Sequence, residues 1–151
     1  MRRVETLTPW IHRAVLMMST LAFVRIGLRH ILDPVGAAAA VGGTLNATMA
    51  VTTARVGLGG FPIAIALFNL TCLMSPRRRA AGVRLVAIVA FTVIAVRLYS
   101  AVVDGGAPQS TKLFIPESVI LVGSVTGLVL ERARGGRESQ GSPAAIKIEG
   151  P

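Results

Sequence analysis

Long apolar segments separated by short polar ones dominate the chain. A membrane-spanning helix needs about 20 mostly apolar residues to cross about 30 Å of hydrocarbon. Segments of this kind cover residues 11–32, 56–74, 83–103 and 113–130. The first should end at Leu32, because Pro34 disfavours a helical conformation at Asp33. The pattern predicts an all-α polytopic membrane protein, a bundle of four transmembrane helices that forms a single domain over residues 1–131.

The stretch 36–54 is harder to assign, because it is uncharged but rich in Gly, Ala and Thr and therefore only weakly hydrophobic. Arginines cluster near the N-terminus, at residues 77–79 and beyond residue 131. Cytoplasmic loops carry an excess of Lys and Arg, and only a count of four spans puts all these clusters on one side of the membrane. We therefore expect both termini in the cytoplasm and the stretch 36–54 outside, where residues 46–54 can form a helical lead-in to the second span.

The composition places the chain in a membrane. Hydrophobic residues make up 52% of it and charged residues only 15%, against about 25% charged residues in a typical soluble domain. The net charge of +9 lies between the apolar segments and not on one solvated face, so nucleic acid is not an expected partner. The preference for Arg over Lys, with abundant Ala, Gly and Val, fits a GC-rich bacterial genome. We therefore expect a bacterial inner membrane as the location and the lipid bilayer as the partner.

The remaining sequence offers no sign of catalysis. Cys72 is the only cysteine, which excludes a disulfide within the chain and any cysteine-based metal spacing. Phosphate-binding loops, nucleophile–base pairs and cofactor fingerprints are missing from the sequence. We expect no enzymatic activity, no cofactor and no metal. Residues 132–151, rich in Gly, Ser, Pro and charge, are predicted to be a disordered cytoplasmic tail.

Charged residues interrupt the apolar segments at a similar depth. With the N-terminus inside, Arg25, Arg97 and Glu117 lie about 10, 9 and 6 Å below the outer ends of their spans, from a rise of 1.5 Å per residue. Other charged residues lie at the outer rim or one helical turn from these positions. The predicted cluster comprises Arg25, Arg29, Asp33, Arg55, Arg97, Asp104 and Glu117. By contrast, Trp10, His12 and Tyr99 are assigned to the membrane interface.

This cluster has two possible roles. Ionisable groups in hydrocarbon face a protein interior or a wet cavity and pair with each other. Arginines outnumber carboxylates in the cluster, so an excess Arg could hold an anion such as a phosphate, a carboxylate or a lipid head group. Pairs of Arg with a carboxylate also tie helices together without any further role. For Arg97 and Glu117, which are on different helices, both roles stay open.

Small residues indicate close helix packing in the fourth span. Gly123 and Gly127 form a small-xxx-small pair, which lets helix backbones approach each other. The same pair could serve a homodimer, but we expect packing within one chain.

The order of several short motifs is similar to that of a known family. Gly27-Leu-Arg29 leads to Asp33-Pro34, Arg55 is followed by Gly59-Gly60, Arg97-Leu-Tyr-Ser100 leads to Asp104-Gly105, and Glu117 opens the last span. In these motifs the chain resembles the small four-helix bacterial membrane proteins of the domain-of-unknown-function 4345 family. The resemblance covers residues 22–130 and implies a four-helix membrane protein. It implies no activity.

Two functions fit this sequence. The first is a non-enzymatic inner-membrane protein whose outer-leaflet polar pocket holds a small anionic or lipid ligand, or a membrane partner protein. The alternative is a small proton-coupled transporter that uses Glu117, which requires a carboxylate able to gain and lose a proton near neutral pH. An adjacent arginine would keep Glu117 ionised, so a contact between Arg97 and Glu117 separates the two.

Overall fold

The structure is a computed structural model that describes the backbone of residues 2–103 and 108–140 and the side chains of residues 7–103 and 115–133. The described residues form helices and contain no strand. In chain order the elements are α1 (Arg2–Leu32), α2 (Pro34–Ala39), α3 (Thr48–Ala54), the π-helix η1 (Arg55–Gly60), α4 (Phe61–Met74), α5 (Arg79–Val103) and α6 (Pro108–Gln140).

The end of α1 is set by local chemistry, as the sequence predicts. The helix stops at Leu32, and Asp33 leaves the helical region with φ −137° and ψ 73°. The Asp33 carboxylate then accepts the backbone N–H of Gly36 at 2.9 Å and caps α2. Pro34 is the first residue of α2, where its missing N–H removes no helical hydrogen bond.

The second apolar segment begins earlier than its composition predicts. α3, η1 and α4 follow one another without a break, so one helical rod runs from Thr48 to Met74. The predicted lead-in is therefore the first part of this rod. Within η1 the Phe61 N–H donates to the carbonyl of Val56, which widens the helix by one residue per turn. Pro62, which has no N–H to donate, follows directly.

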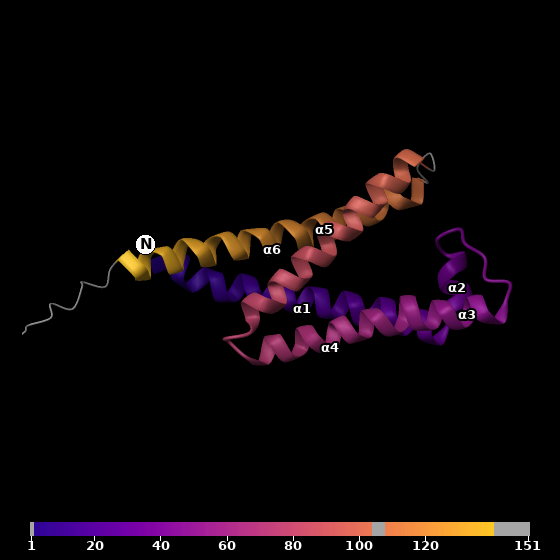
Figure 1. Ribbon diagram of the computed structural model, residues 1–151, viewed down its shortest axis with the longest axis horizontal. Helices are drawn as coiled ribbons and strands as arrows, with labels where there is room; N and C mark the ends of the chain where they lie inside the picture. The colour runs from indigo at the N-terminus through magenta and orange to yellow at the C-terminus, as the bar shows by residue number, and fades with distance from the viewer. Residues whose placement is uncertain (1, 104–107, 141–151) are drawn as a thin grey trace, which may run out of the picture.

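α1 lies at the centre of the helix packing and contacts α4, η1, α5 and α6. The start of α1, the turn between α4 and α5 and the C-terminal part of α6 lie at one end of the molecule (Figure 1). We call this the basic end, because the arginine clusters of the sequence fall on these three segments. α2, α3 and the meeting ends of α5 and α6 lie at the opposite end.

The core lies in the half of the molecule near the basic end. It comprises Val15, Leu16, Cys72, Val83 and Val86, from α1, α4 and α5. α6 closes this core through its glycines: a Cβ on Gly123 would lie 3.2 Å from Val15, and one on Gly127 2.8 Å from the ring of His12. The small-xxx-small pair therefore packs within the chain.

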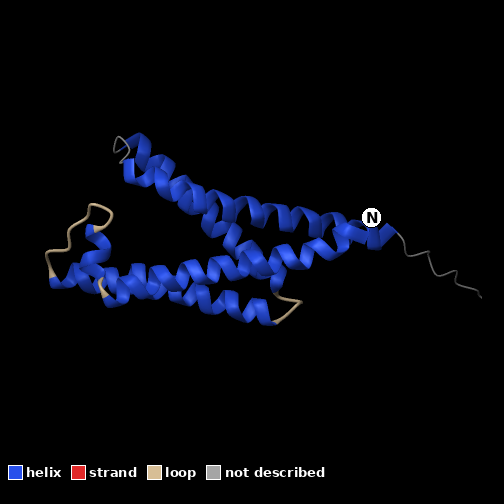
Figure 2. Ribbon diagram, turned by 180° about the vertical axis from the view of Figure 1, so that it is seen from behind, coloured by secondary structure: helices blue, strands red, loops and turns tan. Residues whose placement is uncertain are grey.

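Toward the opposite end the molecule divides into two arms (Figures 1 and 2). The first arm consists of α2, α3, η1 and the part of α1 that is far from the basic end. The second arm consists of the part of α5 that is far from the basic end and the start of α6. The buried residues of α5 end at Ala90, and none follows up to Val103. In the first arm α1 stays in contact with η1 through Gly27 and Gly59.

Among the described residues, three helices are long and apolar enough to cross a membrane: Leu7–Leu32, Thr48–Met74 and Arg79–Val103. Large apolar side chains on all three are exposed, among them Leu21, Phe61 and Phe91. This surface suits contact with lipid. The fourth predicted span lies in α6, where side chains before Ile115 are outside the described residues. α6 continues as a helix to Gln140, into the predicted tail, whose residues 141–151 are also outside them.

The contact between Gly27 and Gly59 yields a test of the first arm. A Cβ on Gly27 would lie 2.8 Å from the backbone oxygen of Gly59 and 2.7 Å from Ile63, so Gly27→Ala should force the two helices apart. Overpacking of this kind costs about 1–3 kcal/mol, and we expect that loss in the free energy of unfolding in detergent micelles. Gly57→Ala is the control, because a Cβ there meets nothing within 4 Å. Equal effects of the two substitutions would contradict the contact.

Candidate functional site

Arg97 lies on the stripe of α5 that faces the protein interior. Val86 and Ala90, both buried, precede it by about three and two helical turns on that face. At the level of Arg97, however, α1 and η1 have already separated from α5, as the ribbon shows (Figure 1). The charged side chain therefore sits on a core-facing stripe beyond the end of the core, and α6 is the helix that it meets there.

The guanidinium of Arg97 binds the carboxylate of Glu117 side-on. Nε donates to Oε2 at 2.8 Å and to Oε1 at 3.0 Å, and Nη2 donates to Oε1 at 2.8 Å. The side chains are 24% and 21% exposed, so the pair is largely withdrawn from the surface. Charge-assisted bidentate contacts of this geometry are the strong ones among protein hydrogen bonds. The pair joins α5 to α6 and uses both carboxylate oxygens.

The arginines of the first arm are in a different state. Arg25 and Arg29 on α1 and Arg55 at the start of η1 are exposed. None of the three makes a hydrogen bond or ion pair with another described residue. Asp33, the acidic residue nearest in sequence, is engaged in capping α2. The first arm therefore carries positive charge that the described side chains do not neutralise.

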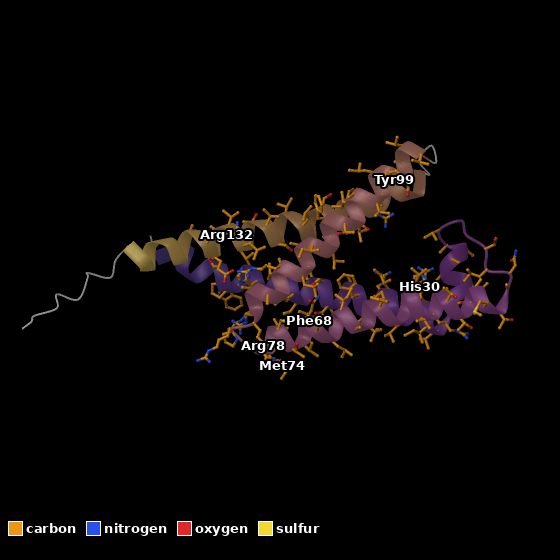
Figure 3. All side chains as sticks on the ribbon, viewed as in Figure 1. His30, Phe68, Met74, Arg78, Tyr99 and Arg132 are labelled. Atoms are coloured by element: carbon orange, nitrogen blue, oxygen red, sulfur yellow. The ribbon has the colours of Figure 1, made fainter. Side chains whose placement is uncertain are left out.

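The structure thus separates the predicted cluster into two groups. Arg97 and Glu117 lie together on the second arm, while Arg25, Arg29, Asp33 and Arg55 belong to the first arm. Figure 3 shows the separation through Tyr99, on α5 near Arg97, and His30, on α1 beside Arg29. Asp104 is outside the described residues.

The sequence analysis did not identify the polar residues that are buried near the core. His12, assigned above to the membrane interface, is only 5% exposed and lies against Gly127 of α6, so that assignment is wrong. Asn69 of α4 donates to the hydroxyl of Ser19 on α1 at 3.2 Å, and both are fully buried. Asn69 Oδ1 and His12 Nε2 have no hydrogen-bond partner among the described residues. A lone polar residue in an apolar segment is the signal that could have identified Asn69.

The described residues contain no group of three or more His, Cys, Asp or Glu side chains close enough to hold a metal ion. What the charged groups can do is narrower. The Arg97–Glu117 pair can fix the helices of the second arm, and the unpaired arginines can attract an anion through charge and hydrogen-bond donors.

Comparison with known proteins gives a match at the level of the family. The family model described as Domain of unknown function (DUF4345) matches residues 11–125 of the chain. No curated protein matches the chain, and no solved structure does. The matched range begins within α1, includes α2 to α5 and ends within α6 beyond Glu117.

The Arg97–Glu117 pair can be tested by a double-mutant cycle. Either Arg97→Leu or Glu117→Leu leaves one charge without its partner, which costs about 3–5 kcal/mol when the pair is fully buried. Because this pair keeps some exposure, we expect a loss of about 2 kcal/mol for each single change. The free energy of unfolding of the double variant should be lower than that of wild type but higher than that of the less stable single variant.

The matched control for this cycle is Arg29→Leu, the same chemical change at an arginine that has no ionic partner among the described residues. It should leave the free energy of unfolding nearly unchanged. Strictly additive losses for Arg97→Leu and Glu117→Leu would mean that the two side chains do not interact.

Proposed function

The chain belongs to the DUF4345 family, and we propose that it is a bacterial inner-membrane protein without enzymatic activity that holds a small anionic or lipid ligand, or a membrane partner protein, near its outer surface. Its three candidate spans make it compatible with a membrane protein. In the proposed arrangement α6 is the fourth span, and the arms lie in the outer leaflet.

One observation carries the proposal: Glu117 already occupies Arg97, while Arg25, Arg29 and Arg55 have no carboxylate partner among the described residues. A charged group near hydrocarbon is costly unless it pairs or reaches water. Three guanidinium groups on one arm therefore favour a bound anion, and Arg is well suited to phosphate and carboxylate because its planar donors match two oxygens at once. Arg97 is less suited, because Glu117 uses its side-on donors.

The same contact weighs against the transporter alternative. A proton-coupled carrier needs a carboxylate that releases and takes up a proton during each cycle. The guanidinium of Arg97 donates three hydrogen bonds to the two carboxylate oxygens of Glu117. Because both carboxylate oxygens are engaged with α5, the pair supports a structural role for Glu117.

The arginine clusters support the proposed orientation in the membrane. They lie on segments at the basic end of the molecule (Figure 1), and positive loops stay in the cytoplasm. In intact cells an impermeant thiol reagent should label a cysteine placed at Thr44 or Ser110 and not one placed at Ser75, each in a Cys72→Ala background. Labelling of Ser75→Cys alone would reverse the proposed topology.

Anion binding should stabilise the folded protein by mass action, by about 2.7 kcal/mol at a ligand concentration one hundred times the dissociation constant. We expect phosphates, carboxylates or anionic lipids to raise the melting temperature of the purified protein. The rise should be smaller for Arg25→Gln, Arg29→Gln and Arg55→Gln. Arg77→Gln, an exposed arginine at the basic end, is the control and should respond as wild type does.

Uptake assays in reconstituted vesicles under a pH gradient test the transporter alternative. Uptake of a cationic substrate that depends on the gradient and on Glu117, together with no anion effect on melting, would replace the proposed function by proton-coupled transport.

A further inference from the structure

A second charged region lies between α5 and α6 near the basic end, away from both arms. It is a groove of about 390 Å³. Its walls are the residues Arg84, Val125, Leu128, Val129, Glu131 and Arg132. Arg84 comes from α5, and the other five residues come from α6. Figure 3 shows Arg132 at the same end of the molecule as Arg78 of the α4–α5 turn.

The groove carries net positive charge. Arg84 and Arg132 are exposed and make no ion pair or hydrogen bond with another described residue, and Glu131 pairs with neither of them. Two guanidinium groups against one carboxylate leave an excess of one positive charge on the lining. Arginine side chains of this length reach from a helix toward the head groups while their stems stay on apolar surface.

The lining changes character along α6. Val125, Leu128 and Val129 come first, and Glu131 and Arg132 follow toward the basic end. Trp10 marks the membrane interface at this level: it is 66% exposed, and its neighbour Ile11 lies against Gly127. Val125 thus lies on the hydrocarbon side of this level, Leu128 and Val129 lie close to it, and Glu131 and Arg132 lie on the water side.

We propose that this groove binds an anionic phospholipid of the leaflet at the basic end. The phosphate sits between the guanidinium groups of Arg84 and Arg132, and an acyl chain lies along Val125 and Val129. Basic pockets between membrane helices on the cytoplasmic side suit such head groups. A free phosphate would leave the apolar wall unused, whereas a lipid fills both parts. The site differs from the one proposed for the first arm in leaflet, helices and residues, so neither depends on the other.

Native mass spectrometry of the full chain in detergent can measure this binding, with phosphatidylglycerol as the probe and phosphatidylcholine as the neutral comparison. Phosphatidylglycerol should bind more tightly than phosphatidylcholine. Arg84→Gln and Arg132→Gln should each weaken phosphatidylglycerol binding about fivefold, the effect of one basic residue near a membrane surface. Equal binding of the two lipids, or no effect of either substitution, would overturn the proposal.

Glu131→Gln gives a test with the opposite sign. Because Glu131 holds neither arginine in place, its carboxylate acts on the phosphate by repulsion alone, and its removal should tighten phosphatidylglycerol binding. Weaker binding in this variant would contradict the proposed position of the phosphate.

Two further comparisons make the result specific. Arg77→Gln, an exposed arginine of the same end outside the groove, should bind phosphatidylglycerol as wild type does. Glycerol phosphate, which has no acyl chain, should bind far more weakly. A loss with Arg77→Gln as large as with Arg132→Gln, or equal binding of glycerol phosphate, would reject a lipid site.

Discussion

The close packing of α1 against its neighbours is the constraint on which the rest of the structure depends. Lipid tails are as apolar as leucine side chains, so helices in a bilayer associate by van der Waals packing that small residues permit. Glycines lie at each of these contacts: Gly59 of η1 against Ile31, Gly82 of α5 against Leu16, and Gly123 of α6 against Val15. The positions of these glycines in the sequence therefore determine where the helices touch and how closely they approach.

The same packing decides how the charges are distributed. Among the described residues, the glycine contacts that hold α5 and α6 on α1 lie in the half near the basic end, and the described part of the second arm has none. Arg97 therefore pairs with a carboxylate from α6 and makes no hydrogen bond or ion pair with a described residue of α1. The arginines of the first arm have no ionic partner among the described residues, so their charge is available to a group outside the chain. Whether an arginine forms an ion pair or stays exposed thus depends more on how far the helices diverge than on its depth along a span.

The sequence predicts those features that depend on neighbouring residues. The end of α1 at Leu32 follows from Pro34, and the all-helical class and the family follow from apolar segments and short motifs. Features that depend on how helices lean on one another were beyond it. Depth along a span places Arg25 and Arg97 in one layer, but periodicity carries no information on the angle between α1 and α5. For the same reason the burial of His12 under α6 was missed.

The π-helix η1 has a mechanical consequence. Because Pro62 has no N–H, neither Leu58 nor Gly57 can receive a backbone hydrogen bond from that position, whether the turn is α or π. The rod from Thr48 to Met74 thus has fewer internal bonds at one point than elsewhere, and π-turns and prolines are where helices bend sharply. A bend at this joint would tilt α3 relative to α4, which packs on α1. Arg55 stands at the moving side of the joint, so a tilt of α3 would change its distance from Arg29 without disturbing the core.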